Sequence, residues 1–234
     1  MSFVGGMANV TPFRHEDADQ SVKRLPTDRI TSAEAASLFP ELDAVSPIVK
    51  AAFDPARSVH VIPRLEELLG DRATLASLAD DELERLRTLV PRIEAACRDL
   101  ESYALPETIQ HDDLHDGQVF VRDGRYVFFD WGDACLSHPF FTLVVTLAVL
   151  AYRLELEHGS PELDRFRDAY LEPWTRFRPR SDLEQAYPIA FRLGVLCRGL
   201  TWALIVSAIP RPLREQEQDA VPERMRMLLE VYAA

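Results

Sequence analysis

The chain has 234 residues, of which 47% are hydrophobic and 27% charged, and its formal net charge is −12. A chain of this length and composition can bury a sizeable core, which excludes intrinsic disorder and allows one domain or a large plus a small lobe. The acidic balance argues against nucleic acid as a partner and favours cationic small molecules, because like charges repel.

The first 65 residues predict short strands around one helix. The segment QSVKRLP at 20–26 is typical of the end of a strand, and residues 31–39 are typical of a helix. Two further strands are expected at 45–53 and 58–62, with a turn at Asp54-Pro55. Gly5-Gly6 lacks the spacing of a glycine-rich phosphate-binding loop.

An amphipathic helix is predicted over residues 83–100, with Asp81 and Glu84 as a capping pair at its start. Its apolar residues recur at spacings of three and four: Leu83, Leu86, Val90, Ile93, Cys97 and Leu100. By segment, the net charge is −1 for 1–65, −6 for 66–110, −4 for 111–150 and −1 for 151–234. The acids of the second segment either line the solvated face of this helix or contribute to an acidic cleft.

A β-hairpin is predicted over residues 119–129. Apolar runs flank the dipeptide Asp123-Gly124, which is a strong short-range hairpin signal. The residues that enter and leave a hairpin meet at the end opposite its turn. We therefore expect Asp113, Gln118 and Asp130 within reach of one cation, and their oxygen atoms are the ligands that Mg²⁺ prefers.

Four helices are predicted after the hairpin, over residues 139–158, 161–177, 186–208 and 223–232. The first is expected to end at Gly159. Its apolar run at 140–152 is too short to span a bilayer, which favours a core helix.

Two motifs resemble a known family. HDDLHDGQ (111–118) and FFDWGDA (128–134) look like the catalytic loop and metal-binding segment of aminoglycoside phosphotransferases and choline kinases, relatives of protein kinases whose pattern runs roughly HGDLHxxN and then DW or DF. HPFF (138–141) and DAYLEPW (168–174) are similar to a bacterial branch, so the resemblance spans roughly residues 65–210. It implies a protein-kinase-like α+β fold. A truncated N-terminal nucleotide-binding β lobe would occupy 1–65, and a mainly helical catalytic and substrate lobe with a catalytic hairpin would occupy 66–234.

The resemblance also implies an activity, the transfer of the γ-phosphoryl group of ATP or GTP to a small-molecule hydroxyl with Mg²⁺. Asp113 would be the catalytic base and His111 would brace its loop. Gln118 would take the place of the metal-binding Asn, and Asp130 would bridge the magnesium ions. The acceptor could be an antibiotic, an amino alcohol or a sugar, and the choice between ATP and GTP stays open.

For the small lobe, the resemblance requires a lysine that anchors the phosphates. The chain has two lysines, Lys23 and Lys50, and Lys23 with Glu34 as its ion-pair partner is the favoured pair. The alternative is that both lysines are ordinary surface residues. Residues 62–67 would form the hinge between the lobes. An incomplete sheet edge predicts pairing with a second copy, and hence a homodimer.

Two departures from the family pattern favour an alternative. Gln118 is one methylene longer than Asn, and Thr142 stands where much of the family has an Asp that ties down the catalytic loop. Both departures, together with the short small lobe, favour a catalytically impaired kinase-like protein that binds a ligand or scaffolds a partner. A metal-dependent hydrolase that uses the same aspartates is a third reading.

The remaining metal-binding and redox candidates point to structural roles. His111 and His115 are four residues apart, but no third soft ligand for zinc lies nearby. The odd number of cysteines, Cys97, Cys135 and Cys197, argues against a disulfide framework and favours buried thiols in the cytoplasm. The N-terminus has neither a basic start nor the apolar core of a secretory signal, which also predicts a cytoplasmic protein.

Overall fold

The computed structural model describes residues 61–122, 125–157, 159–209, 214 and 217–233. Lys23, Glu34 and the Asp123-Gly124 turn lie outside these residues, as do the strands and helix expected before residue 61. The described chain is mainly helical with two short pairs of strands, in agreement with the α+β class. The boundary at residue 65 and the truncated small lobe stay predictions.

Residues 61–67 are helical, so the end of the strand predicted at 58–62 is wrong, and the hinge predicted at 62–67 stays a prediction. They belong to α4 (Val61–Gly70), in which Pro63 occupies the first turn, where a missing N–H is tolerated. Leu65, Leu68 and Leu69 are buried on one face of this helix. Their spacing of three and four places an apolar stripe against the core, and its burial decides the conformation of this segment.

The predicted amphipathic helix is confirmed as α5 (Asp80–Ser102). Four of the predicted residues are buried, Leu83, Leu86, Ile93 and Leu100, together with Leu89, whereas Val90 and Cys97 are only partly buried. The predicted capping pair is wrong, because the carboxylate of Glu82 accepts the hydrogen bond from the backbone N–H of Ala79 at 2.9 Å. Only a carboxylate three residues after the N-cap reaches back to that N–H.

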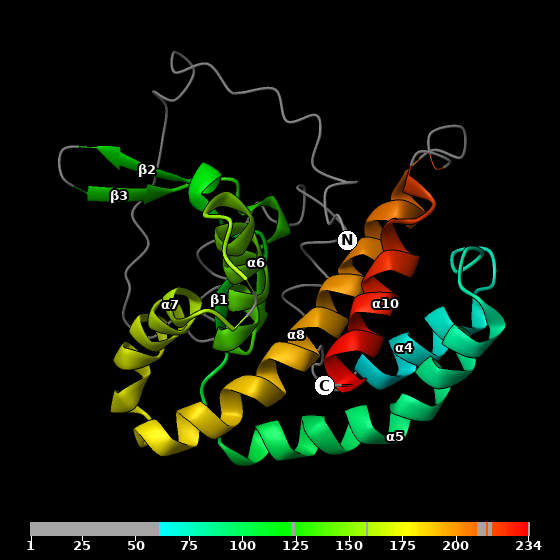
Figure 1. Ribbon diagram of the computed structural model, residues 1–234, viewed down its shortest axis with the longest axis horizontal. Coiled ribbons are helices and arrows are strands. Elements are labelled where there is room, and N and C mark those ends of the chain that lie inside the picture. Colours follow the sequence, from blue (N-terminus) through cyan, green and yellow to red (C-terminus); the bar gives the residue numbers. More distant parts are fainter. Residues whose placement is uncertain (1–60, 123–124, 158, 210–213, 215–216, 234) are drawn as a thin grey trace, which may run out of the picture.

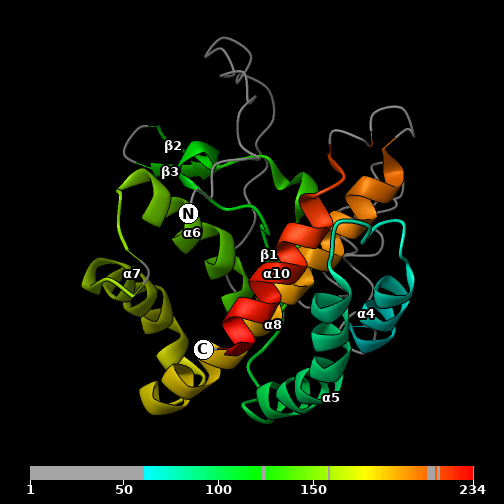
Figure 2. The same ribbon diagram turned by 45° about the vertical axis from the view of Figure 1, so that its right-hand side comes forward.

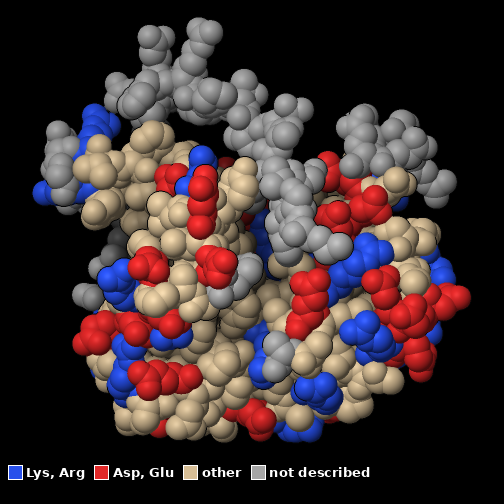
Figure 3. Space-filling view, in the orientation of Figure 1, with Lys and Arg blue, Asp and Glu red and all other residues tan. Residues whose placement is uncertain are grey.

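Three acidic side chains of α5 are paired with arginines at the surface. The pairs are Asp80 with Arg72 at 2.8 Å, Glu84 with Arg87 at 3.6 Å and Glu94 with Arg98 at 3.0 Å. Acidic and basic side chains are interspersed over much of the face seen in Figure 3. These acids therefore belong to the solvated face of the helix, and the carboxylates of 111–133 are left as the acids of interest.

Two antiparallel strand pairs carry the acidic motifs. β2 (Val119–Arg122) and β3 (Arg125–Phe128) form the predicted hairpin, with Val119 opposite Phe128. β1 (Thr108–Gln110) pairs with β4 (Cys135–Ser137), so the chain before the first motif lies beside the chain after the second. This second pair was not predicted, because three-residue strands are too short to show a periodic pattern.

The helices after the strands differ from the prediction mainly at their ends. The helix predicted at 139–158 is a 3₁₀ turn, Pro139–Thr142, followed by α6 (Leu143–Arg153). α7 (Pro161–Leu171) gives way to a 3₁₀ segment, Glu172–Arg176, because Pro173 cannot continue an α-helix. α8 (Arg180–Ala208) begins six residues before the predicted start, and α10 (Ala220–Ala233) ends the described chain.

The long helix α8 passes through the middle of the described fold. It packs against α10, α5, α4 and the 3₁₀ turn at 139–142, and Figures 1 and 2 show α10 alongside it, with α4 and α5 on one side and the strands with α6 and α7 on the other. A Cβ at Gly199 would collide with Met225, so this glycine allows the close approach of α10. By length and composition, α8 is the one described helix that could cross a membrane. Its packing on several other helices is that of a core helix.

Candidate active site

Backbone contacts at the base of the hairpin bring the two acidic motifs together. The N–H of Phe129 donates to the carbonyl of Gln118 at 3.2 Å. On the other side, Nε2 of His111 lies 2.7 Å from the carbonyl oxygen of Phe129 and must donate to it, since a carbonyl only accepts. The chain segments before and after the hairpin therefore meet, as the hairpin predicts.

His111 is fixed between these two segments. Its side chain is buried, and its ring lies 4.8 Å from the ring of Trp131. Nδ1 is buried and has no hydrogen-bond partner among the described residues. The position suits the bracing role that the resemblance implies, and that role stays a prediction.

Gln118 and Asp130 form a pair of oxygen-bearing side chains at this junction. Nε2 of Gln118 donates to Oδ2 of Asp130 at 3.1 Å, and Gln118 is 8% exposed. Asp130 has a left-handed backbone, with φ 61° and ψ 55°, an arrangement that Asp tolerates better than most residues. This backbone turn directs its carboxylate toward the glutamine.

The pair fits a magnesium ion that is only partly held by protein. Mg²⁺ keeps several waters and takes one or two carboxylates together with substrate phosphates. Among the described residues, no group of three His, Cys, Asp or Glu side chains could hold a metal by itself. Asp130 and the amide oxygen of Gln118 would supply two hard ligands, and nucleotide and water would supply the others. For this the glutamine amide must turn its oxygen toward the ion.

Asp113 is held through one of its two oxygen atoms. Oδ1 accepts from Arg198 at 2.9 Å, and Oδ2 lies 3.8 Å from Nε2 of His115. Nδ1 of His115 accepts from the N–H of Gly117, so the neutral ring carries its proton on Nε2, facing Asp113. Burial raises the pKa of the Asp113 carboxyl, and the positive charge of Arg198 opposes that rise.

Arg198 is the site residue that the sequence analysis missed. It lies on α8, 85 residues after Asp113, and also contacts Asp112 at 3.3 Å and Asp133 at 3.4 Å. One signal was available: Arg198 is the one charged residue in the apolar stretch 193–209. A buried arginine needs carboxylate partners, and the chain offered them in the acidic motifs.

A threonine links the loop at residues 111–118 to α6. The hydroxyl of Thr146 lies 2.8 Å from the carbonyl of Leu114 and 2.9 Å from the carbonyl of Thr142. Thr142 stands at the position where an Asp was expected from the family pattern. Here the link to the loop comes from the hydroxyl one helical turn later.

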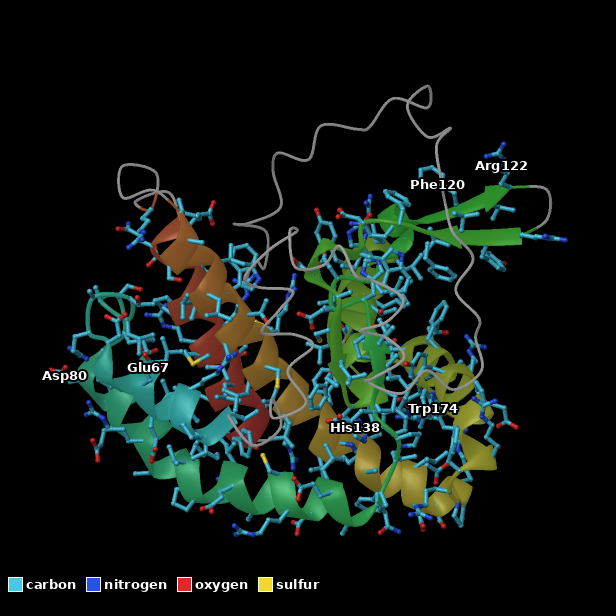
Figure 4. All side chains as sticks on the ribbon, turned by 180° about the vertical axis from the view of Figure 1, so that it is seen from behind. Glu67, Asp80, Phe120, Arg122, His138 and Trp174 are labelled. Atoms are coloured by element: carbon cyan, nitrogen blue, oxygen red, sulfur yellow. The ribbon has the colours of Figure 1, made fainter. Side chains whose placement is uncertain are left out.

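A cavity of about 170 Å³ borders the loop at residues 111–118. Its walls come from α4, α5, β4 and α8, and the side chains are mainly apolar. Asp112 and His138 also line it, and Figure 4 labels His138. Cys97, Cys135 and Cys197 all line this cavity, and burial raises the pKa of Cys97.

Comparison with known proteins identifies the family. A family model described as the phosphotransferase enzyme family, APH, matches residues 20–180. The chain belongs to this family. The match spans both acidic motifs and begins within the first 60 residues. A search of curated proteins found no match.

Membership of the phosphotransferase family gives the chain a kinase-like fold and a phosphotransferase type of activity. Members of the family generally use ATP and Mg²⁺.

The hairpin of this phosphotransferase exposes several large apolar residues: Phe120, Val121, Tyr126 and Phe128. Figure 4 shows Phe120 and Arg122 on the hairpin, which extends away from the helices.

Proposed function

We propose that the chain is an ATP- or GTP-dependent phosphotransferase that transfers the γ-phosphoryl group to a hydroxyl of a small molecule. One observation carries the proposal: the Gln118–Asp130 pair, 3.1 Å apart, lies at the junction of the loop that bears the half-buried carboxylate of Asp113. A hard-cation site next to a base is the arrangement that phosphoryl transfer requires.

In this mechanism the protein positions the reactants and accepts one proton. Asp113 takes the proton of the acceptor hydroxyl, and that oxygen forms a bond to the γ-phosphorus. The bond between the γ-phosphorus and the bridging oxygen breaks, which leaves the nucleoside diphosphate. Gln118 and Asp130 would hold Mg²⁺, which neutralises the charge on the phosphates when bound. His111 keeps the loop against the chain that follows the hairpin.

The remaining parts of the proposal concern the ligands. Lys23 with Glu34 stays the proposed phosphate anchor. We propose a cationic acceptor such as an amino sugar as the first class to test, because the site carries the carboxylates of Asp112, Asp113 and Asp133 against Arg198. A cytoplasmic location and a homodimer remain parts of the same proposal.

The test is phosphate transfer to a panel of an aminoglycoside, an amino alcohol and a sugar, measured as ADP or GDP released and as phosphorylated acceptor. Asp113→Asn and Asp130→Asn should each lower the transfer rate by at least about 100-fold. Asp116→Asn is the matched control, because Asp116 lies in the same loop but is exposed and faces Arg153 at 3.6 Å. Wild-type rates in the first two variants would overturn the proposal.

One observation favours a second function, a kinase-like protein that binds nucleotide without turnover. The amide nitrogen of Gln118 donates to Asp130, so the two side chains satisfy each other without a cation. Calorimetric titration with ATP in the presence of magnesium or of a chelator separates the two functions. Binding that is unaffected by chelation, together with absent transfer, supports the second one.

A further inference from the structure

A single guanidinium on α8 binds carboxylates from both acidic motifs. Arg198 contacts Asp113 at 2.9 Å and Asp112 at 3.3 Å in the catalytic loop, and Asp133 at 3.4 Å after the hairpin. The NH1 nitrogen donates to Asp112 and Asp133, and the NH2 nitrogen donates to Asp113 alone. The proposed base, Asp113, therefore shares its guanidinium nitrogen with no other carboxylate among the described residues.

The group is shielded from solvent, which strengthens its electrostatics. The side chains of Arg198 and Asp112 are 14% and 12% exposed, and those of Asp113 and Asp133 are 32% and 34% exposed. An ion pair in such surroundings is screened much less than one at the surface. Thr201 adds a weak contact to Asp112 from the next turn of α8, at 3.5 Å.

We propose that Arg198 is a positioning residue for the phosphoryl transfer proposed above: it fixes the Asp113 carboxylate through Oδ1 and leaves Oδ2 as the atom that accepts the hydroxyl proton. The inference rests on the proposed function of the site. A two-armed guanidinium can hold Asp113 on one arm and the flanking acids on the other, which the single ammonium of a lysine cannot do.

The charge of Arg198 has a second effect, on the protonation of the base. Burial raises the pKa of Asp113, and the main opposing influence is Arg198. The other groups that act on this carboxyl are His115 and His111, which favour its ionised form, and Asp133, which disfavours it. Arg224 on α10 is a more distant cation that interacts with Asp113. Removal of Arg198 should therefore raise the pKa of Asp113.

A merely structural role makes a different prediction. If Arg198 only ties α8 to the loop, its loss lowers stability and lowers the rate equally at every pH. If Arg198 positions Asp113 and favours its ionised form, removal of Arg198 shifts the rise of kcat with pH to higher pH. The carboxyl ¹³C titration of Asp113, assigned with the Asp113→Asn variant, reports the same shift without any need for turnover.

The experiment compares Arg198→Met, Arg198→Lys and Arg192→Met. The control residue lies on the same helix, and its guanidinium donates to the carbonyl of Val231 instead of to a carboxylate. We expect Arg198→Met to raise the pKa of Asp113 by about one unit, because an opposite charge at this distance has an effect of that size. At a pH below the pKa of Asp113 in both proteins, kcat of the variant should be about tenfold lower than that of the wild type. Well above the pKa of Asp113 a smaller loss of kcat should remain, because the carboxylate is then ionised but is no longer fixed through Oδ1. Arg198→Lys should shift less, and Arg192→Met should not shift at all.

Each outcome decides the inference. An unchanged pKa of Asp113, or a loss of rate that is equal at all pH values, overturns it. Should Arg198→Met fail to fold because three carboxylates repel, Arg198→Lys and the double variant Asp112→Asn with Arg198→Met decide by the same titration. A wild-type protein that transfers no phosphate would defeat the proposed function. The titration would still show whether Arg198 controls Asp113.

Discussion

The amide nitrogen of Gln118 donates a 3.1 Å hydrogen bond to Oδ2 of Asp130. This bond holds two proposed magnesium ligands together. It also directs an N–H donor at Oδ2 of Asp130, the atom that would face the ion. To bind a cation, the glutamine must rotate its amide and order one more torsion than an asparagine would. The length of this side chain therefore sets the first prediction.

Gln118→Asn should increase apparent magnesium affinity. The shorter side chain has one torsion fewer to order, so we expect the half-saturating magnesium concentration to fall by about threefold. Gln118→Leu, which removes the amide, should raise it. The measurement is transfer rate or calorimetric nucleotide binding against magnesium concentration. An asparagine variant that needs more magnesium than the wild type would show that the length of glutamine is required to reach the ion.

Thr146→Val should loosen the catalytic loop. The substitution keeps the shape of the side chain and removes the hydroxyl, whose single proton the carbonyls of Leu114 and Thr142 share. We expect a loss of about 1 kcal/mol in the free energy of unfolding and a several-fold lower kcat. Urea denaturation and steady-state kinetics measure the two effects. Thr88→Val is the control, since its hydroxyl bonds only Arg85 of its own helix; an equal fall in kcat there would argue against a specific link to the loop.

The stability of the fold should fall between about pH 7.5 and pH 5 because of His138. Burial lowers the pKa of this histidine from 6.5 to about 4, and its Nδ1 accepts from the N–H of Phe140. An unfolded chain then binds more protons than the folded one over this range, so acid favours unfolding. The expected loss is about 2 kcal/mol by pH 5.

His138→Asn provides the matched variant for this pH effect. The asparagine oxygen can take over the cap to Phe140, but the side chain does not titrate. Urea denaturation at the two pH values should show a smaller loss in the variant than in the wild type. Equal losses in both proteins would assign the effect to other groups.

Asp113→Asn should leave the fold at least as stable as the wild type at neutral pH. Burial raises the folded pKa of Asp113 above 3.8, so the ionised form reduces stability as pH rises through that folded value. The stability gained in the variant should therefore vanish near or below pH 3.8. Thermal unfolding across this pH range measures it.

Asp71→Asn should change the stability in the direction opposite to Asp113→Asn. Hydrogen bonds from Thr74 and Ala73 lower the pKa of Asp71, so its ionised form stabilises the fold above the unfolded pKa. Its replacement should lower the melting temperature at neutral pH, with a smaller effect in acid. If Asp113→Asn instead lowered the melting temperature as Asp71→Asn does, the carboxylate would contribute more through Arg198 than its burial costs.

Features with a local cause could be predicted from the sequence. The hairpin follows from alternating apolar residues around Asp-Gly, and α5 follows from its apolar period, so both were expected in the right place. The ends of helices were less predictable. The end of the strand predicted at 58–62 is helical instead, because a short strand and a short buried helix share the same apolar content. The conformation of this segment depends on whether Leu65, Leu68 and Leu69 can pack against α5 and α8.

The sequence by itself determined the residues proposed for the chemistry, Asp113, Gln118 and Asp130, and the hairpin that brings their segments to one end. Only the tertiary structure decided what acts on them. Arg198 reaches Asp113 across 85 residues of chain, and Thr146 reaches Leu114 from α6. The physical reason is that a local pattern sets the direction of a strand or a helix face, whereas the pairing of a buried charge or hydroxyl depends on which helices pack together.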